Sequence, residues 1–120
     1  MNAQQIQEKM DQLHYWDAQV LRLSSDYFTD EVILAYDDED MIVTYRFICC
    51  YKSNFFHWLG YEKEKPYRDL TQGQIPYFLQ DVEVKEIEEE KRKLYSCKIL
   101  MPPMELEIWC KDIEVSSEAR

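Results

Sequence analysis

Hydrophobic and polar residues alternate over positions 31–51, in two runs that flank four consecutive acidic residues. In the first run, Val32, Leu34 and Tyr36 share one face. In the second run, the residues of one face are Met41, Val43, Tyr45, Phe47, Cys49 and Tyr51. Such alternation is typical of a strand with one buried face, and a polar cluster between two such runs indicates a turn. The segment therefore predicts an antiparallel β-hairpin with its turn at residues 37–40.

Four further strands are predicted from the same kind of pattern. They are residues 18–23, a strand that begins at Val82, residues 94–101 and residues 104–110. The second and third of these form another hairpin around a charged tip, and the two prolines at 102–103 interrupt the ladder because proline donates no backbone hydrogen bond. Ile113 and Val115 have the opposite parity from the apolar residues of 104–110. If they are also buried, the chain has a bulge or bend at residues 111–112.

An N-terminal helix is predicted over residues 3–13, because Ile6, Met10 and Leu13 recur at helical spacing among polar residues. Its apolar stripe is expected to lie on the sheet. Residues 116–120 are a short polar tail that we expect to fray at the surface.

The middle of the chain, residues 53–80, holds both glycines and two of the four prolines. This composition predicts mostly loop, with one short helix. The fold class is therefore a single α+β domain over residues 1–120. It consists mainly of an antiparallel sheet of about six strands, with the N-terminal helix and this loop-rich insertion.

The net charge of the chain limits the kinds of molecule that it is expected to bind. The chain has 14 Lys and Arg against 24 Asp and Glu, a net charge of −10. This balance disfavours nucleic acid and anionic membranes and favours a basic protein partner, although acidic residues also serve solubility. Residues 1–5 lack the pattern of a signal peptide, and the longest apolar run, 47–51, is too short to cross a membrane. We expect a cytoplasmic protein with reduced cysteines and no membrane insertion.

No catalytic residue, metal site or cofactor is predicted. The acidic stretch 26–40 lacks the alternating ligands and the glycine of a calcium loop. Cys49 and Cys50 are adjacent on a predicted strand and so point to opposite faces, which does not suit zinc. There is no Gly-x-Ser-x-Gly turn, and two glycines in all cannot supply a phosphate-binding loop. A non-enzymatic protein is favoured.

Two segments are candidates for a partner-binding surface, the acidic turn and the aromatic part of the loop-rich middle. The predicted partner-binding residues are Asp37, Asp38, Glu39, Asp40, Phe55, Phe56, Trp58 and Tyr61. Carboxylates complement a basic surface, and aromatic side chains dominate interface hot spots. The alternative is that the aromatic residues of 55–78 mostly cover one face of the sheet and are core.

Two other readings stay open. A pocket near His14, Asp17, Arg46 and His57 would make the protein a small-molecule-binding domain or a minor hydrolase. An uncovered sheet face or edge would favour a homodimer, because a second copy can bury it through a two-fold axis.

The run Leu13-His14-Tyr15-Trp16-Asp17-Ala18, which leads into a strand and an acidic hairpin, resembles the entry to small bacterial proteins of immunity-protein type. The closing strand 106–110 is compatible with them. Those families usually place Leu-His-Asp directly before the strand, whereas here Tyr15 and Trp16 separate His14 from Asp17. The resemblance implies a stoichiometric binder that blocks a toxin domain, with no catalysis and no cofactor.

Overall fold

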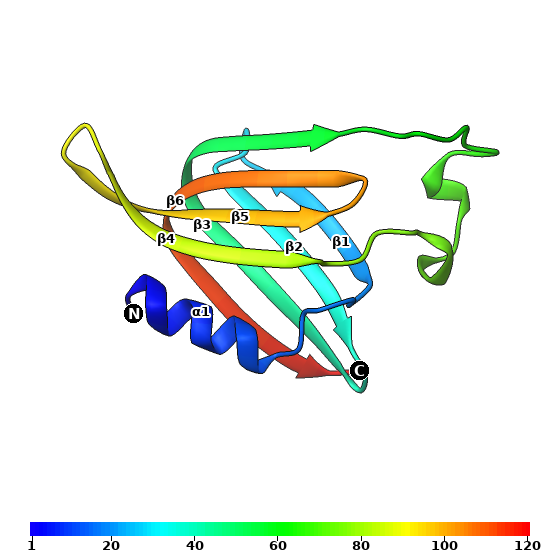
Figure 1. The fold of residues 1–120 in the computed structure, drawn as a ribbon, viewed down its shortest axis with the longest axis horizontal. Helices are drawn as coiled ribbons and strands as arrows, with labels where there is room; N and C mark the ends of the chain where they lie inside the picture. The colour runs from blue at the N-terminus through cyan, green and yellow to red at the C-terminus, as the bar shows by residue number, and fades with distance from the viewer.

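One N-terminal helix and a six-stranded antiparallel sheet make up the fold (Figure 1). The computed structural model describes residues 1–120. The elements are α1 (Ala3–Gln12), β1 (Val20–Asp26), β2 (Glu31–Asp38), β3 (Met41–His57), β4 (Asp81–Glu89), β5 (Arg92–Met101) and β6 (Met104–Ala119), with short 3-10 turns at Tyr67–Asp69 and Gln72–Gln74. The strand order is β1-β2-β3-β6-β5-β4, with every neighbouring pair antiparallel. The predicted α+β class, both hairpins and the N-terminal helix are confirmed.

The two longest strands, β3 and β6, pair with each other along their whole length and bend together (Figure 1). In β3, Cys49 has a φ of 57° and the register shifts between Cys50 and Lys52. This is a β-bulge, which kinks a strand and changes the face to which later side chains point. As a result, Cys49 and Tyr51 do not continue the buried face of the preceding residues, contrary to the sequence prediction, and Tyr51 is exposed.

The bend in β6 was predicted. Cys110 is buried, the next two residues are exposed, and Ile113 and Val115 are buried again. The sheet therefore folds over at residues 111–112, opposite the β3 bulge.

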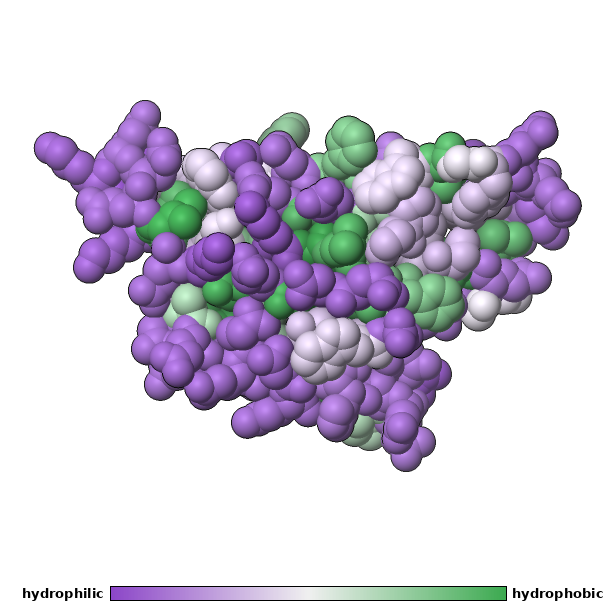
Figure 2. Space-filling model, viewed as in Figure 1, coloured by the Kyte–Doolittle hydropathy of each residue, from purple (hydrophilic) through white to green (hydrophobic).

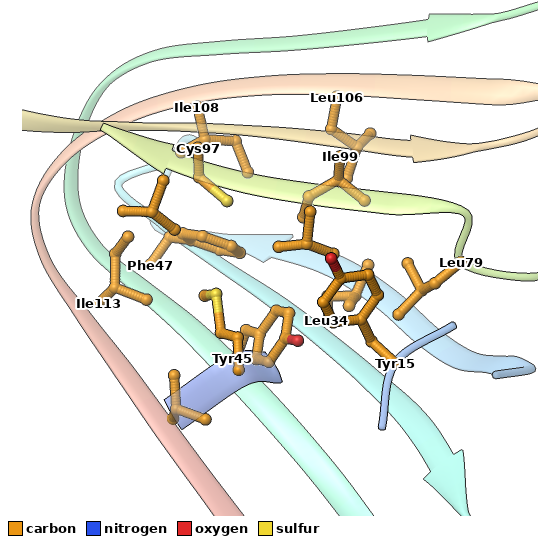
Figure 3. Close-up of a cluster of buried hydrophobic side chains, with 14 of the residues drawn as sticks. Tyr15, Leu34, Tyr45, Phe47, Leu79, Cys97, Ile99, Leu106, Ile108 and Ile113 are labelled. Carbon is orange, nitrogen blue, oxygen red and sulfur yellow. The ribbon is translucent and has the colours of Figure 1, made fainter. Parts of the chain in front are cut away.

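The core lies between the two halves of the folded sheet. One half contains β1, β2, the start of β3 and the end of β6, and the other contains the remaining parts of β3 and β6 with β5 and β4 (Figure 1). Leu34, Tyr45 and Phe47 from the first half and Ile99 and Leu106 from the second point into the space between them and are fully buried (Figure 3). Burial of one such side chain is worth about 1.5–3 kcal/mol, so this space holds the main stabilising contacts.

Helix α1 begins at a capping box, in which the Asn2 side chain accepts from the Gln5 backbone and the Gln5 side chain accepts from the Asn2 backbone. Its buried residues are Ala3, Ile6 and Met10, so the predicted stripe lies on the sheet. No helix of the protein combines the length and the apolar character that crossing a bilayer requires.

The segments before β1 and β4 pair with each other and draw the two outer strands together. Val20 N–H donates to the Tyr77 carbonyl at 2.7 Å, and Leu79 N–H donates to the Ala18 carbonyl at 2.9 Å. Gln19 and Phe78 form the antiparallel bridge at this point. The curved sheet is thus joined edge to edge at one end.

Two parts of the prediction were wrong in their boundaries. Residues 53–57 belong to β3 and not to a loop, so the irregular insertion begins at Trp58 and contains two 3-10 turns where one short helix was expected. The tail 116–120 is not frayed, because β6 runs to Ala119, which pairs with Met41. Arg120 N–H also donates to the Asp40 carbonyl at 3.0 Å. Polar composition misled the prediction, since an outward face of a strand is also polar.

Candidate protein-interaction surfaces

Two of the four carboxylates in the acidic turn between β2 and β3 interact with cationic or titratable side chains of the same chain. Asp37 forms an ion pair with Arg120 at 2.7 Å. Asp38 lies 3.5 Å from the Nδ1 atom of His14, and only 16% of its side chain is exposed. Glu39, which adopts a φ of 55°, and Asp40 are both exposed. Only these last two carboxylates are therefore free to meet a partner.

Further carboxylates extend this charge along the outer face of β6. Asp112, Glu114 and Glu118 are exposed and alternate with the buried Ile113 and Val115, so all three point away from the core. Glu118 lies opposite Ile42 in the β3–β6 ladder, which brings it next to the turn. We call the set the acidic strip; it consists of Glu39, Asp40, Asp112, Glu114 and Glu118.

Sequence reasoning missed the β6 part of the acidic strip because Glu118 was assigned to the frayed tail 116–120, and Asp112 and Glu114 lay outside the predicted strand 104–110. The signal was present, since residues 112, 114, 116 and 118 are acidic or polar at a period of two. Arg46 lies opposite Glu114 in the β3–β6 register.

The four predicted aromatic residues are exposed and come from the end of β3 and the loop after it. Phe56 is 65% exposed, Tyr61 52%, Trp58 41% and Phe55 37%. The rings of Phe56 and Trp58 lie on the same face with their centroids 5.5 Å apart. Phe55 points to the other face, in register with the buried Leu106, and is exposed because no strand lies beside it.

The alternative, that the aromatic residues of 55–78 are mostly core, is therefore wrong, and only Tyr77 among them is buried. Tyr77 anchors the insertion to the sheet. Its hydroxyl bonds to Nε2 of His57 and donates to the Tyr67 hydroxyl at 3.4 Å, and the Tyr67 and Tyr61 hydroxyls lie 3.0 Å apart. This chain of polar contacts fixes the first part of the insertion against the end of β3.

The acidic and aromatic residues do not form one surface. Figure 1 shows the β2–β3 turn beside the C-terminus, at the lower right, whereas the insertion that follows β3 extends from the upper right of the molecule. In Figure 2, green and pale side chains gather in the upper half of the face, and hydrophilic side chains dominate the lower part, where α1 lies. The structure thus offers two separate surfaces where the sequence suggested a combined one.

The four residues of the alternative pocket have different neighbours and do not converge. His14 faces Asp38, Asp17 accepts a hydrogen bond from Gln80 at 3.0 Å, and His57 bonds to Tyr77. Arg46 is exposed on the outer face of β3.

The two main surface hollows lie elsewhere. One, of about 470 Å³, lies in the half of the β4–β5 hairpin that is nearer its turn, beside Glu86, Tyr95 and Lys111. The other, of about 520 Å³, lies within the insertion beside Tyr61 and Lys65. Neither is lined by any residue of the predicted pocket. No group of three or more His, Cys, Asp or Glu side chains is placed to hold a metal ion.

All four cysteines are free thiols. Burial raises the pKa of the Cys50 thiol to about 11 and also raises the pKa values of Cys97 and Cys110. A thiol with a raised pKa carries little of the reactive thiolate at neutral pH. Cys50 and Cys110 lie opposite each other in the β3–β6 ladder, where they pack at the bend.

Residues 2–117 match the family model described as immunity protein PIM7. The chain belongs to this family. The match spans the aromatic residues and the acidic strip up to Glu114, and it confirms the resemblance to immunity proteins that the sequence indicated. A comparison with curated proteins finds no matching sequence. Membership in the PIM7 family gives the protein an immunity role, and the structure shows which surfaces a PIM7 protein presents.

Proposed function

We propose that the protein acts in the cytoplasm as a stoichiometric inhibitor, which binds a toxin domain and blocks it. The observation that carries this proposal is the match of residues 2–117 to an immunity-protein family. A binder needs exposed surface groups rather than a reactive cleft, and the exposed groups of this chain include many carboxylates and several aromatic rings. Free cysteines, two of them fully buried, also suit a reducing compartment.

We propose that the toxin binds to the acidic strip. The contacting face of the toxin would then be basic. The five carboxylates of the acidic strip are exposed, and none of them forms an ion pair within the chain. Free charges of one sign raise the rate of encounter with an opposite surface by about 10- to 1,000-fold at low salt. The net charge of −10 adds to this attraction and repels nucleic acid. Asp37 and Asp38, whose carboxylates are engaged with Arg120 and His14, shape the turn instead.

The experiment begins with capture of the toxin from a lysate of the source organism, followed by purification of the captured protein. Its association rate with the wild-type chain is then compared with that of the double variant Glu114→Lys/Glu118→Lys. The matched control is Glu88→Lys/Glu89→Lys, which changes the net charge equally on exposed residues of the β4–β5 hairpin. The strip variant should associate at least about tenfold more slowly than the control at low salt, with a smaller difference at high salt.

Equal slowing in both variants would show that only net charge matters and would remove the acidic strip from the proposal. Growth of cells that express the toxin gives the second readout. Wild-type chain should protect them, the control variant should protect them equally, and the strip variant should protect them less. A captured protein that is not toxic to cells would contradict the inhibitory function itself.

A further inference from the structure

The bend in the sheet leaves the last part of β3 as an open edge. β2 pairs with β3 only over residues 41–48, whereas β6 continues to pair with β3 as far as His57. Cys50 N–H still reaches the Asp30 carbonyl at 2.9 Å, but no strand lies beside residues 52–57 on that side. We call residues 52–57 the β3 edge.

The backbone groups that the β3 edge leaves free follow from its register. Trp58 N–H donates to the Pro103 carbonyl at 3.0 Å, so Trp58 directs its backbone groups toward β6. In an antiparallel pair, alternate residues bond to the same neighbour. The N–H and C=O groups of Ser53, Phe55 and His57 therefore point away from β6, into the space where another strand would lie.

The other edges of the sheet are protected. On β4, the Gln7 side chain donates to the Val82 carbonyl and accepts from the Val84 N–H, both at 2.8 Å. The end of β6 carries the charges of the acidic strip, and β1 carries Arg22 and Asp26 at the surface. Natural proteins block edges with such charges or with covering elements because an open edge pairs with other strands.

The β3 edge has no comparable protection. It contains exposed Phe55 and Phe56 and no carboxylate, and its single lysine, Lys52, is held by Glu107 and lies 4.2 Å from the Trp109 ring centre. The chain as a whole has a net charge of −10, but the β3 edge itself carries no negative charge. Two β3 edges can therefore approach each other without repulsion between carboxylates of the two edge strands. A basic strand, in contrast, finds no carboxylate here to pair with.

We propose that the β3 edge pairs with the β3 edge of a second copy of this chain, antiparallel and around a two-fold axis at Phe55. This register places Phe55 opposite Phe55 and Ser53 opposite His57, so every outward backbone group of these three residues gains a partner. On the outer face it places Phe56 opposite Asn54 and Trp58 opposite Lys52. The two sheets then form one continuous sheet, and the exposed aromatic rings of each copy pack on the other.

The first test uses the wild-type protein. Sedimentation equilibrium over a range of concentrations should show a monomer–dimer equilibrium, and amide hydrogen exchange should slow at Ser53, Phe55 and His57 as the dimer forms. The inward amides of Asn54 and Phe56 serve as internal controls, because their bonds to β6 exist in the monomer and their exchange should change less. A monomer at all concentrations would overturn the proposal, as would a dimer in which the outward amides stay fast.

The second test changes the edge itself. Phe55→Pro removes an outward N–H without touching the β6 ladder, and Phe55→Lys puts two like charges on the two-fold axis while keeping every backbone group. Both variants should be monomers with the same circular dichroism spectrum as the wild type. Trp16→Ser, which removes an aromatic residue that is 60% exposed elsewhere, should leave the dimer unchanged. A dimer that persists in Phe55→Lys would place the interface on another surface. The toxin contact proposed above uses the acidic strip, so the two proposals fail independently.

Discussion

The side-chain oxygen of Gln7 accepts a hydrogen bond from the backbone N–H of Val84 at 2.8 Å, and the amide nitrogen of Gln7 donates to the Val82 carbonyl at the same distance. One helical side chain thus takes the place of a neighbouring strand at the edge of β4. Ala3 N–H also donates to the Glu86 side chain at 3.0 Å, so α1 is fixed to β4 by polar contacts as well as by its buried stripe.

Replacing Gln7 with Ala should lower the free energy of unfolding by about 1–3 kcal/mol, because two hydrogen bonds are lost and two part-buried backbone groups lose their partners. Urea unfolding measures the change. Gln4→Ala is the matched control, since Gln4 is an exposed glutamine on the same helix that bonds only to Glu8, and it should change stability by less than about 0.5 kcal/mol. Equal effects of the two substitutions would contradict the role of Gln7 at the β4 edge.

The bulge at Cys49 leads to a second prediction. A φ of 57° is costly for a residue with a side chain and costs glycine nothing sterically. Cys49→Gly should therefore keep the fold with unchanged or increased stability, by up to about 1 kcal/mol, whereas Cys49→Val should destabilise because a β-branched residue does not tolerate this conformation. Thermal unfolding of the two variants measures the contrast. Equal stability of the two would show that residue 49 does not set the bulge.

Sequence pattern predicted the elements of the fold well and failed at the bulge. The alternation of Val43, Tyr45 and Phe47 correctly identified the buried face, because period-two burial is a local property of a strand. The bulge at Cys49 has no local signal such as a glycine, so the pattern was carried through it to the wrong face. The opposite parity of Ile113 did reveal the matching bend in β6.

The candidate surfaces were only partly visible in the sequence. Exposure of Phe55, which shares a face with the buried Leu106, depends on the absence of a strand beside the end of β3, which is a property of the strand order and not of nearby residues. The engagement of Asp37 with Arg120 joins residues that are distant in the chain and meet only through the β3–β6 ladder. Local composition could find acidic and aromatic segments but could not say which side chains are free.

A third prediction concerns two tyrosines that connect the core to the end of α1. The Tyr45 hydroxyl donates to the Tyr36 hydroxyl at 3.4 Å, and the Tyr36 hydroxyl donates to the Leu13 carbonyl at 2.8 Å. Tyr36→Phe should cost about 1–3 kcal/mol, because it leaves the buried Tyr45 hydroxyl and the Leu13 carbonyl without this partner. Tyr45→Phe should cost less than about 1.5 kcal/mol, since Tyr36 keeps its bond to Leu13. A larger loss in Tyr45→Phe would contradict the order of this chain of hydrogen bonds.

The same tyrosines make the fold sensitive to alkali. Burial raises the pKa of Tyr36 to about 12 from an ordinary value of 10.0, and burial also raises the pKa of Tyr45. Because the folded state holds these protons more tightly than the unfolded state, their contribution is complete below pH 10 and is lost as the pH rises toward the folded pKa. The free energy of unfolding should fall from about pH 10 upward, and less steeply in Tyr45→Phe. An identical slope in the variant would contradict this assignment.

The last prediction concerns Glu107, on the outer face of β6, and the change in the free energy of unfolding at acidic pH. Glu107 bonds to Lys52 and lies 3.7 Å from Lys98, and the hydrogen bond from Lys52 is the main cause that lowers the pKa of Glu107 below its ordinary value of 4.5. A lowered folded pKa gives stability that is present above pH 4.5 and is lost as the pH falls through the folded value. The free energy of unfolding of Glu107→Gln should thus differ from that of the wild type most at neutral pH, and the difference should shrink in acid.

The Glu107 side chain is 27% exposed, so the difference in the free energy of unfolding should also shrink in high salt. Urea unfolding at neutral and acidic pH tests both trends, and Glu105→Gln, an exposed neighbour outside these ion pairs, is the control. A pH-independent difference between Glu107→Gln and the wild type would show that Glu107 acts through packing and not through its charge.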